Sequence, residues 1–240
     1  MENNLNFICY CGVYDNIMPV FSKMFNKYWD KDIKVDVVSH KKIKLEEKNF
    51  TCFQYEEDNF SKCMLEHMSK LDFDHVVFMT EEMVLVDFVD QDIFKKAYKI
   101  IKYSDKIKKI NLYRFLNNYY KIGIDDSYYG PHLSYYDDDF AFNKDSFRSI
   151  NASIWNKDLF CELLQSLIDA EYDKITPHTF EYNVNCTNDF DSLIPYKPVY
   201  PCIDYMHRTR GFAFEEARFF NNGISSQDLL TFVENKNDNK

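Results

Sequence analysis

Apolar and polar residues follow two distinct patterns along the first half of the chain. Short apolar runs bounded by polar or turn residues predict buried strands, and apolar residues at helical spacing predict amphipathic helices. Strands are expected over residues 7–11, 33–39, 51–55, 75–79 and 108–113. Helices are expected over residues 16–28, from Asp58 or Asn59 onward, and over 90–103. Strands that alternate with helices are typical of a parallel sheet with crossover helices, so the pattern predicts an α/β fold.

The second half of the chain is less regular. Residues 119–142 are rich in Tyr and Asp around a Gly130-Pro131 turn, which predicts an antiparallel hairpin or a mobile loop. Beyond it we expect helices over 156–169, from Thr176-Pro177, over 214–222 and from Ser225 or Ser226, and a strand within 198–205. Neither a repeat nor a linker interrupts the chain, so we expect one domain over residues 1–233 and a polar tail over 234–240.

Composition narrows the possible functions. A chain of 240 residues with 45% hydrophobic residues can bury the core of one α/β domain. It has only five glycines and neither a GxxxxGK[ST] nor a GxGxxG motif, which excludes P-loop and dinucleotide-binding Rossmann sites. A net charge of −10 repels nucleic acid and anionic membranes unless a local basic patch overrides it. We interpret the lysine-rich run over 95–109 as the solvated face of a helix and its exit, and expect no nucleic-acid partner.

Cysteine usage and the N-terminus indicate the compartment. The seven cysteines are scattered, without a CxxC pair or zinc-like spacing, and several lie in apolar runs as buried thiols of a reducing compartment do. The first residues are polar rather than basic and then apolar, so no signal peptide is expected. No apolar stretch approaches the roughly 18 residues of a membrane span. We therefore expect a cytoplasmic protein without a transmembrane segment.

Two adjacent carboxylates carry the clearest chemistry. In an open α/β sheet, ligands bind beyond the carboxyl ends of the strands, and Glu81 and Glu82 follow the strand over 75–79 at such an end. Their hard oxygens suit Mn²⁺ or Mg²⁺, which could hold a diphosphate. The alternative is a solvated strand end. The acidic run 137–139 is a rival metal motif, but no apolar strand precedes it, so we interpret it as a solvated turn.

Five segments carry a resemblance to a known family. In chain order they are 7–29 (FICYCGVYDNIMPVFSKMFNKYW), 76–90 (VVFMTEEMVLVDFVD), 152–164 (ASIWNKDLFCELL), 176–181 (TPHTFE) and 204–211 (DYMHRTRG). Their order and spacing resemble those of small GT-A glycosyltransferases of bacteria and large DNA viruses, over roughly residues 6 to 224. The resemblance implies a GT-A-like, Rossmann-type mixed sheet flanked by helices, in a single domain that binds a nucleotide sugar.

The resemblance also implies residues that hold the nucleoside of the donor. Tyr14 would stack on or flank the base, with a role as a staple at the helix entry as the alternative. Asp15 would accept hydrogen bonds from the base or the ribose. Asp58 would lie near the ribose, although a helix N-cap accounts for it equally well. Glu81 would face the ribose or a metal-bound water.

A second group of residues would hold the diphosphate and the metal. Glu82 would ligate Mn²⁺ or Mg²⁺ directly, and His207 would be a further metal ligand or a phosphate donor. Arg210 and Arg208 would clamp the diphosphate through the guanidinium group. The family usually has Asp-Asp where this chain has Glu81-Glu82, and the extra methylene in each side chain puts metal affinity and metal dependence in question.

The acceptor side would contain the catalytic base and an aromatic residue. Glu181 would deprotonate the acceptor hydroxyl, and the neighbouring Phe180 and Pro177 would partly desolvate it. The alternative is an exposed carboxylate in the first turn of a helix. Trp155 would line the acceptor pocket, since an aromatic ring stacks on the apolar face of a sugar, or would belong to the core.

The leading functional hypothesis is an inverting, metal-assisted glycosyltransferase. It would use a nucleotide-diphosphate sugar, UDP-linked, and a saccharide or glycan acceptor. Two alternatives stay open: a retaining transferase, and a catalytically silent nucleotide-sugar or carbohydrate-binding module. A nucleotidyltransferase would need a basic, glycine-rich N-terminal loop, and the CGVYDN turn offers neither feature. The donated sugar, the acceptor, the linkage and the oligomeric state do not follow from the sequence.

Overall fold

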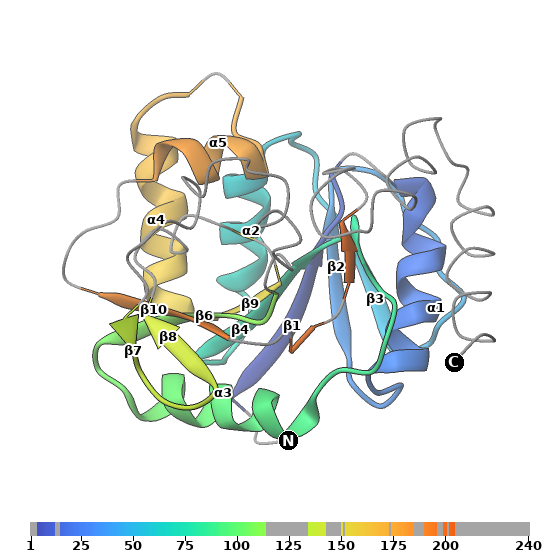
Figure 1. Cartoon of the computed structure of the whole chain (residues 1–240). Helices are drawn as coiled ribbons and strands as arrows, with labels where there is room; N and C mark the ends of the chain where they lie inside the picture. Colours follow the sequence, from blue (N-terminus) through green and yellow to red (C-terminus); the bar gives the residue numbers. More distant parts are fainter. Residues whose placement is uncertain are drawn as a thin grey trace, which may run out of the picture.

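A nine-stranded mixed sheet runs through the protein, which is described from a computed structural model (Figure 1). The strand order is β3-β2-β1-β4-β9-β6-β10-β8-β7, and a separate two-stranded sheet joins β11 to β5. The structure describes residues 4–12, 15–113, 134–142, 150, 152–172, 174–184, 190–195, 199–200 and 202–204.

The elements follow in chain order. The strands are β1 (Leu5–Tyr10), β2 (Val35–Ser39), β3 (Phe50–Gln54), β4 (His75–Thr80), β5 (Met83–Leu85), β6 (Ile107–Asn111), β7 (Ser134–Tyr135), β8 (Phe140–Phe142), β9 (Ser153–Asn156), β10 (Asp191–Pro195) and β11 (Cys202–Asp204). The helices are a short 3-10 helix η1 (Asp15–Ile17), α1 (Met18–Tyr28), α2 (Phe60–Met68), α3 (Gln91–Tyr103), α4 (Lys157–Asp169) and α5 (Pro177–Asn183).

Strand directions divide the large sheet into two parts. Strands β3, β2, β1 and β4 are parallel to one another. Strand β9 inserts antiparallel between β4 and β6, while β10 runs parallel to β6, and β8 and β7 complete an antiparallel edge. This arrangement confirms the predicted α/β fold class, a mixed sheet flanked by helices.

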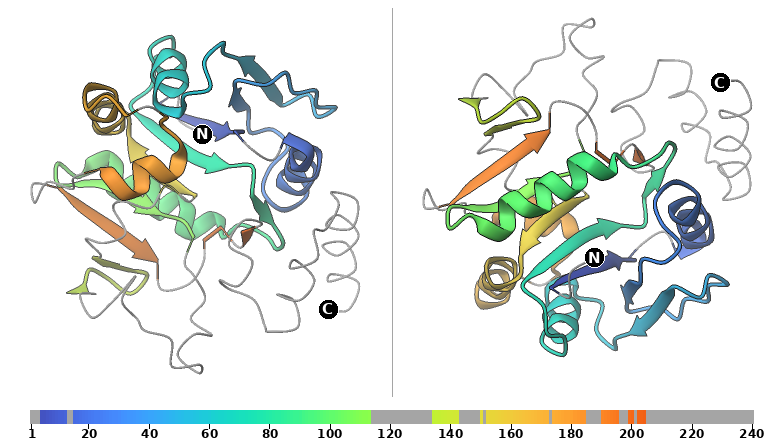
Figure 2. Two further views of the ribbon diagram at one scale, coloured as in Figure 1. Left: turned by 90° about the horizontal axis from the view of Figure 1, so that it is seen from above. Right: turned by 90° about the horizontal axis from the view of Figure 1, so that it is seen from below.

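Alternating side chains of the strands build a core on each face of the sheet. In β1, Phe7 and Cys9 join the cluster beneath α1 and α3, whereas Ile8 and Tyr10 join the cluster beneath α2, α4 and α5. The two end-on views in Figure 2 show these helices on opposite faces. Each large apolar side chain that is fully buried contributes about 1.5–3 kcal/mol, so the central strands and the inward faces of the helices dominate the stability.

Polar side chains fix where several helices begin. Asn59, Asp90 and Asn156 cap α2, α3 and α4 by accepting a hydrogen bond from the backbone N–H three residues later. At α5, Thr176 and Thr179 form a capping box and Pro177 occupies the first turn. The N-cap of α2 is therefore Asn59 and not Asp58, which leaves the Asp58 carboxylate to other partners.

The predicted elements of the first half agree with the structure, and three strands were missed. The expected strands and helices appear with boundaries shifted by a few residues, and the strand expected within 198–205 is β11. It pairs with β5 and stays outside the large sheet. Strands β5, β9 and β10 were not expected. The helices predicted over 214–222 and from Ser225 or Ser226, and the predicted tail, lie outside the described residues.

The interpretation of the lysine-rich run over 95–109 as a solvated face is wrong for one of its residues. Lys95, Lys99 and Lys106 are exposed, as predicted. Lys109, however, lies on β6 with no exposed surface, and its ammonium sits 4.6 Å from the centre of the Trp155 ring. A cation over an indole face is a favourable way to bury the charge of a lysine. Lys109 therefore belongs to the core and not to a basic surface.

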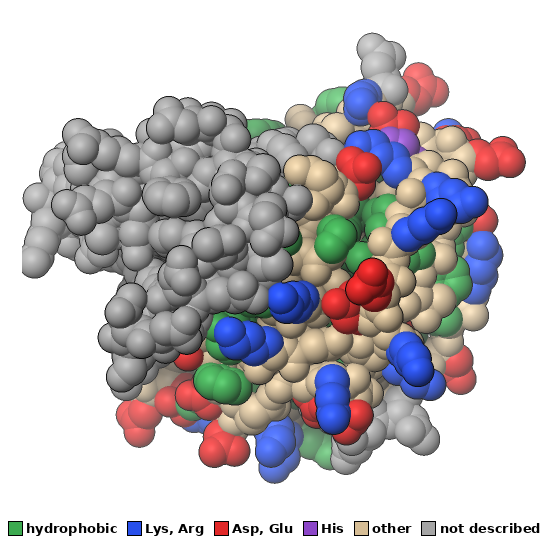
Figure 3. Space-filling model, turned by 90° about the vertical axis from the view of Figure 1, so that its right-hand side faces the viewer, with side chains coloured by type: hydrophobic (Ala, Val, Ile, Leu, Met, Phe, Trp, Pro, Cys, Tyr) green, Lys and Arg blue, Asp and Glu red, His purple; other side chains and the backbone are tan. Residues whose placement is uncertain are grey.

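The surface and the cysteines fit the remaining composition arguments. On the face shown in Figure 3, lysine and acidic side chains of the described residues are interspersed, and neither sign forms a continuous patch there. The six cysteines among the described residues are free thiols, and Cys186 lies outside them. Across the described part of the chain, every helix is too short or too polar to cross a membrane.

Candidate functional site

The order of the parallel strands defines where a ligand would bind. The chain passes from β1 to β2 and β3 on one side, then returns to β4 on the other side of β1. Such a reversal is a topological switch point, and ligands of open α/β sheets bind in the crevice beyond the carboxyl ends of the strands at that point. The residues that follow β1, β2 and β4 therefore form the candidate site. This edge lies at the top of Figure 1, on the side of α5.

A hydrogen bond joins the two strands that flank the switch point. The backbone N–H of Gly12, after β1, donates to Oε1 of Glu81, after β4, at 3.2 Å. The backbone N–H of Glu81 donates to the carbonyl oxygen of Tyr10 at 3.3 Å. Glu81 is only 2% exposed, so its carboxylate is enclosed between the ends of β1 and β4. These contacts place Glu81 at the switch point and give it a role in shaping the turn, while its contact with a nucleotide stays a prediction.

The turn after β1 requires glycine. A Cβ atom at position 12 would lie 2.7 Å from Cε1 of Tyr10. The Tyr10 ring is 2% exposed and packs edge-on against Phe60, with ring centroids 4.8 Å apart. Since the ring has no room to move, a side chain at position 12 would push the turn away from the floor of the crevice.

Glu82 stands beside Glu81 in a more open position. It is half-buried, and its Oε1 accepts a hydrogen bond from the Thr80 hydroxyl at 3.3 Å. The next residue, Met83, pairs in register with Asp204 of β11. The segment that follows Asp204 contains the predicted His207, Arg208 and Arg210, which lie outside the described residues, as does Tyr14.

The donor set at the end of β4 fits a hard divalent cation in part. Glu81 and Glu82 offer carboxylate oxygens, which are the ligands that Mn²⁺ and Mg²⁺ prefer. Within the described residues, no three His, Cys, Asp or Glu side chains gather into a metal-binding group. A complete site would thus need Glu82 together with a ligand from the segment after β11, where His207 was predicted.

Asp15 and Lys41 form an ion pair above the ends of β1 and β2. The Lys41 Nζ lies 2.8 Å from Oδ1 of Asp15. The backbone N–H of Lys41 donates to the Ser39 hydroxyl at 3.0 Å, which fixes the chain just after β2. The hydrogen bond from Lys41 lowers the pKa of Asp15, and the same bond raises the pKa of Lys41, so both groups stay charged near neutral pH.

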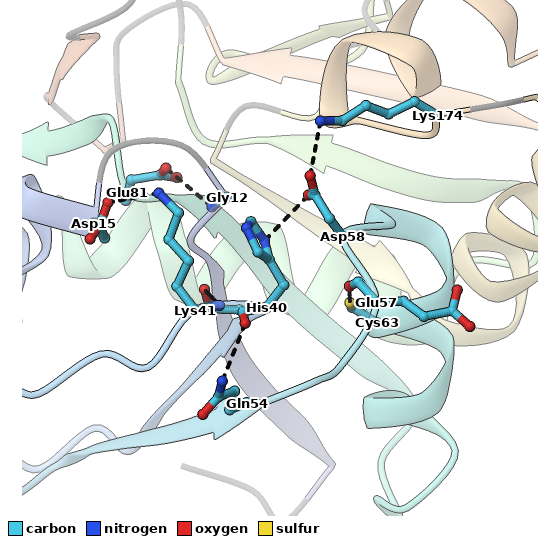
Figure 4. A network of polar contacts seen from close by, with 11 residues as sticks. Gly12, Asp15, His40, Lys41, Gln54, Glu57, Asp58, Cys63, Glu81 and Lys174 are labelled. Carbon is cyan, nitrogen blue, oxygen red and sulfur yellow. Dashed lines mark hydrogen bonds and ion pairs between the residues drawn. The ribbon is translucent and has the colours of Figure 1, made fainter.

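Asp58 bridges two further side chains, Lys174 and His40. Its Oδ2 accepts from Nζ of Lys174 at 2.9 Å, and its Oδ1 lies 3.3 Å from Nδ1 of His40 (Figure 4). The hydrogen bond from Lys174 lowers the pKa of Asp58. The imidazole lies within ion-pair distance of the carboxylate, but Nδ1 of His40 makes no hydrogen bond. Asp58 therefore ties the end of β2 to the segment that leads into α5.

The structure brings Glu181 to the same edge of the sheet. Oε1 of Glu181 accepts a hydrogen bond from the backbone N–H of Ile150 at 3.1 Å. Two residues later, the backbone N–H of Ala152 points at the Met83 sulfur, 3.1 Å away, and Met83 follows Glu82 directly. Glu181 is half-buried in the middle of α5. The alternative of an exposed carboxylate in the first turn of a helix is therefore wrong.

Trp155 lies in the core and not in an acceptor pocket. It has no exposed surface, stacks on Phe160 with ring centroids 4.9 Å apart, and donates from its indole N–H to the Ser153 hydroxyl. Its other face neighbours the Lys109 ammonium. A ring enclosed in this way cannot stack on a sugar, so the core alternative is correct.

The acidic run 137–139 is a turn, as predicted. It joins β7 to β8, and the carboxylates of Asp137 and Asp139 both pair with Lys96 on α3, the former at 3.0 Å. These contacts attach the hairpin to the helix beneath it and offer no metal site.

Sequence reasoning missed three nitrogen-bearing side chains of the site: His40, Lys41 and Lys174. His40 and Lys41 follow β2, and a signal for them existed, because every strand end at a switch point is a candidate position. Lys174 had no such signal, since it reaches Asp58 across 116 positions of the chain.

The chain has distant structural likenesses among known proteins. No family model and no curated protein matches the chain. A cytidylyltransferase from Leptospira borgpetersenii superposes with a TM-score of 0.47 and 12% identity, over 99% of this chain and 96% of that chain. Residues 1–349 of TarS from S. aureus give 0.45 and 12%, over 90% of this chain and 69% of that chain. The 4-diphosphocytidyl-2C-methyl-D-erythritol synthase of Anaerococcus prevotii gives 0.42 and 8%, over 92% and 96%. Likenesses this distant assign no activity, which has to be argued from the residues of the chain.

Proposed function

We propose that this chain is a glycosyltransferase that moves a sugar from a nucleoside-diphosphate sugar, UDP-linked, to a saccharide or glycan acceptor. The observation that supports it best is the meeting of two acidic groups at one edge of the sheet. Glu81 and Glu82 directly follow β4 at the switch point, and Glu181 reaches the same edge through Ile150. A donor and a general base would therefore face each other across a single crevice.

The donor would lie across the carboxyl ends of β4, β1 and β2. Tyr14, Asp15 and Asp58 would hold the nucleoside, with Glu81 in the floor below it. Arg208 and Arg210 would bind the diphosphate from the segment after β11. Asp15 and Asp58 already form contacts with charged side chains. These contacts lower the pKa of both carboxyl groups, so both remain ionised.

Glu181 would act as the general base. In direct displacement, the acceptor hydroxyl attacks the anomeric carbon from the face opposite the nucleotide, and a carboxylate takes its proton as the bond to the diphosphate breaks. The Ile150 N–H fixes one carboxylate oxygen at 3.1 Å, which holds the orientation of the side chain. Such a base accounts for about 10²–10⁴-fold of the rate, and this mechanism inverts the anomeric configuration.

A divalent cation, Mn²⁺ or Mg²⁺, would be held by Glu82 and His207. When bound, it would offset the negative charge of the diphosphate leaving group. The contribution of the chain itself is the position of Glu82, whose carboxylate is held by Thr80 at the rim of the crevice.

Donor hydrolysis tests the proposal without knowledge of the acceptor. Nucleotide sugars are first screened by thermal shift with and without Mn²⁺, because a ligand stabilises the fold in proportion to the logarithm of its concentration over Kd. Release of nucleoside diphosphate from the best donor is then measured for the wild type, Glu181→Gln and Glu82→Gln. Glu162→Gln, an exposed acid on α4, is the matched control.

We expect Glu181→Gln to lower turnover by about 10²–10⁴-fold while donor binding persists. Glu82→Gln should weaken donor binding in Mn²⁺, and Glu162→Gln should change neither quantity. Full turnover in Glu181→Gln, or the absence of any stabilising nucleotide sugar, would contradict the proposal. Anomer analysis of the product by NMR separates the inverting mechanism from a retaining one, and nucleotide binding without turnover would favour the silent binding module.

A further inference from the structure

The ion pair between Asp15 and Lys41 lies at the carboxyl-end edge of the sheet, where the chain leaves β1 and β2. Each side chain is attached to the end of a different central strand, and they meet at 2.8 Å with side chains 50% and 37% exposed. The Ser39 hydroxyl holds the backbone at Lys41. The backbone at Lys41 is therefore held just after β2 while both charged side chains stay partly exposed, and Figure 4 shows the two side chains pointing toward each other.

The strand order places this pair away from the proposed phosphate end. Glu82 follows β4 on one side of β1, and Lys41 follows β2 on the other side. Neighbouring strands are about 4.8 Å apart, so the ends of β2 and β4 are separated by roughly 10 Å. A donor whose diphosphate lies at Glu82 extends its nucleoside over β1 toward β2. The base then arrives at the Asp15–Lys41 pair.

The chemistry of the pair matches the edge of a nucleobase. An ammonium group carries three N–H donors, and a carboxylate carries two acceptor oxygens. The polar edge of each nucleobase places an acceptor next to a donor, which such a pair can meet with charge-assisted hydrogen bonds. Asp15 directly follows Tyr14, the residue predicted to stack on the base, so it would stand at the rim of the stacked ring.

His40 and Lys174 both approach the Asp58 carboxylate, at 3.3 Å and 2.9 Å. Lys41 instead pairs with Asp15, and the donor contacts proposed above do not include Lys41. From these placements we infer that Lys41, together with Asp15, reads the nucleobase of the donor and so determines which nucleoside diphosphate the chain accepts. This inference rests on the proposed function and extends it to base specificity.

Nucleotides that differ only in the base provide the test. The affinities of UDP, CDP, GDP and ADP are measured by calorimetry for the wild type, Lys41→Ala and Asp15→Asn. Lys42→Ala is the matched control, because it removes the same charge from the next, exposed residue. Urea unfolding of each variant shows that the fold is intact, and the exposure of Lys41 makes a loss of folding unexpected.

We expect the wild type to prefer one of the four nucleotides. Lys41→Ala should weaken the binding of that nucleotide by about 10–100-fold, because a charged hydrogen bond is lost. Binding of the other three nucleotides should weaken less, so that the preference becomes smaller. Asp15→Asn should change the ranking, because a carboxamide offers a donor where the carboxylate accepts. Lys42→Ala should leave both affinity and preference unchanged.

Several results would overturn the inference. If Lys41→Ala weakened the binding of all four nucleotides equally, Lys41 would contact the phosphates, since the diphosphate is common to them. Unchanged affinities in both variants, or a wild type that binds all four equally well, would show that the pair does not read the base while leaving the proposed function standing. A wild type that binds none of them would instead remove the proposed function, and the inference with it.

Discussion

Replacing Gly12 with alanine tests the turn on which the switch-point geometry depends. The new methyl group would lie 2.7 Å from Cε1 of Tyr10 and 3.3 Å from its Cζ and Oη. The backbone of Gly12 is outside the left-handed region, so the cost is steric and not conformational. The Tyr10 ring is buried at 2% exposure, which means that the turn or the ring must shift within a packed core.

The size of the effect follows from this overpacking. An extra carbon forced into a packed core costs about 1–3 kcal/mol. For a chain of this length, each kcal/mol lowers Tm by about 2–4 °C, so Gly12→Ala should melt roughly 2–12 °C below the wild type. The shift also moves the Gly12 N–H away from Oε1 of Glu81, a 3.2 Å contact, and we therefore expect weaker nucleotide binding.

A double-mutant cycle separates this clash from a general disturbance of the turn. Tyr10→Leu removes the ring atoms that the new methyl group meets, so Gly12→Ala should cost much less free energy of unfolding in that background. The free energies come from urea unfolding of the wild type, both single variants and the double variant. The steric account is refuted if Gly12→Ala is as stable as the wild type, or if its cost is the same in both backgrounds.

Three further changes have definite expected outcomes. Burial lowers the pKa of His75, so the unfolded chain binds more protons than the native state below about pH 6.5, and the native state loses stability as the pH falls toward the folded pKa. His75→Phe should reduce that loss of stability in unfolding curves measured between about pH 5 and 7. An identical pH profile for the variant and the wild type would count against this explanation. Asn59→Ala removes the cap of α2 and should cost about 1 kcal/mol in urea unfolding, more than Asp58→Ala, whereas the reverse order would restore Asp58 as the cap. Iodoacetamide followed by mass spectrometry should label the exposed Cys52 well before Cys9, whose pKa burial raises far above its usual range, and equal labelling would show that the β1 core opens.

The local pattern of apolar and polar residues was sufficient to predict the strands that form separate apolar runs. Strands β1 to β4 are apolar runs with clear polar or turn boundaries, and the position of Glu81-Glu82 followed from the end of β4. Strand β9 is four residues long and its apolar side chains do not form a separate run, so nothing local marked it. Its insertion between β4 and β6 depends on partners more than 40 positions away, which no local period encodes.

The position of a candidate site residue could be predicted where the residue follows a strand. It could not be predicted where the residue's contacts depend on a partner that is distant in the chain. Glu81 and Glu82 stand at the strand end that the pattern located, whereas Asp15, proposed from the family resemblance, begins η1 after β1. The contacts that define their surroundings join residues far apart in the chain: Lys41 reaches Asp15 over 26 positions, and Lys174 reaches Asp58 over 116. The burial of Trp155 was likewise invisible, because a large aromatic residue before a helix suits a pocket wall and a core equally well.

Amide hydrogen exchange in the presence of UDP and Mn²⁺ tests the central claim most directly, namely that the carboxyl ends of β1, β2 and β4 form one nucleotide crevice. We expect added protection in the segments around Gly12, Lys41 and Glu82, which these three strands present at the same edge, and no change in α4, on whose exposed face Glu162 lies. Protection that leaves these three segments unchanged, or no protection at saturating nucleotide, would contradict the account.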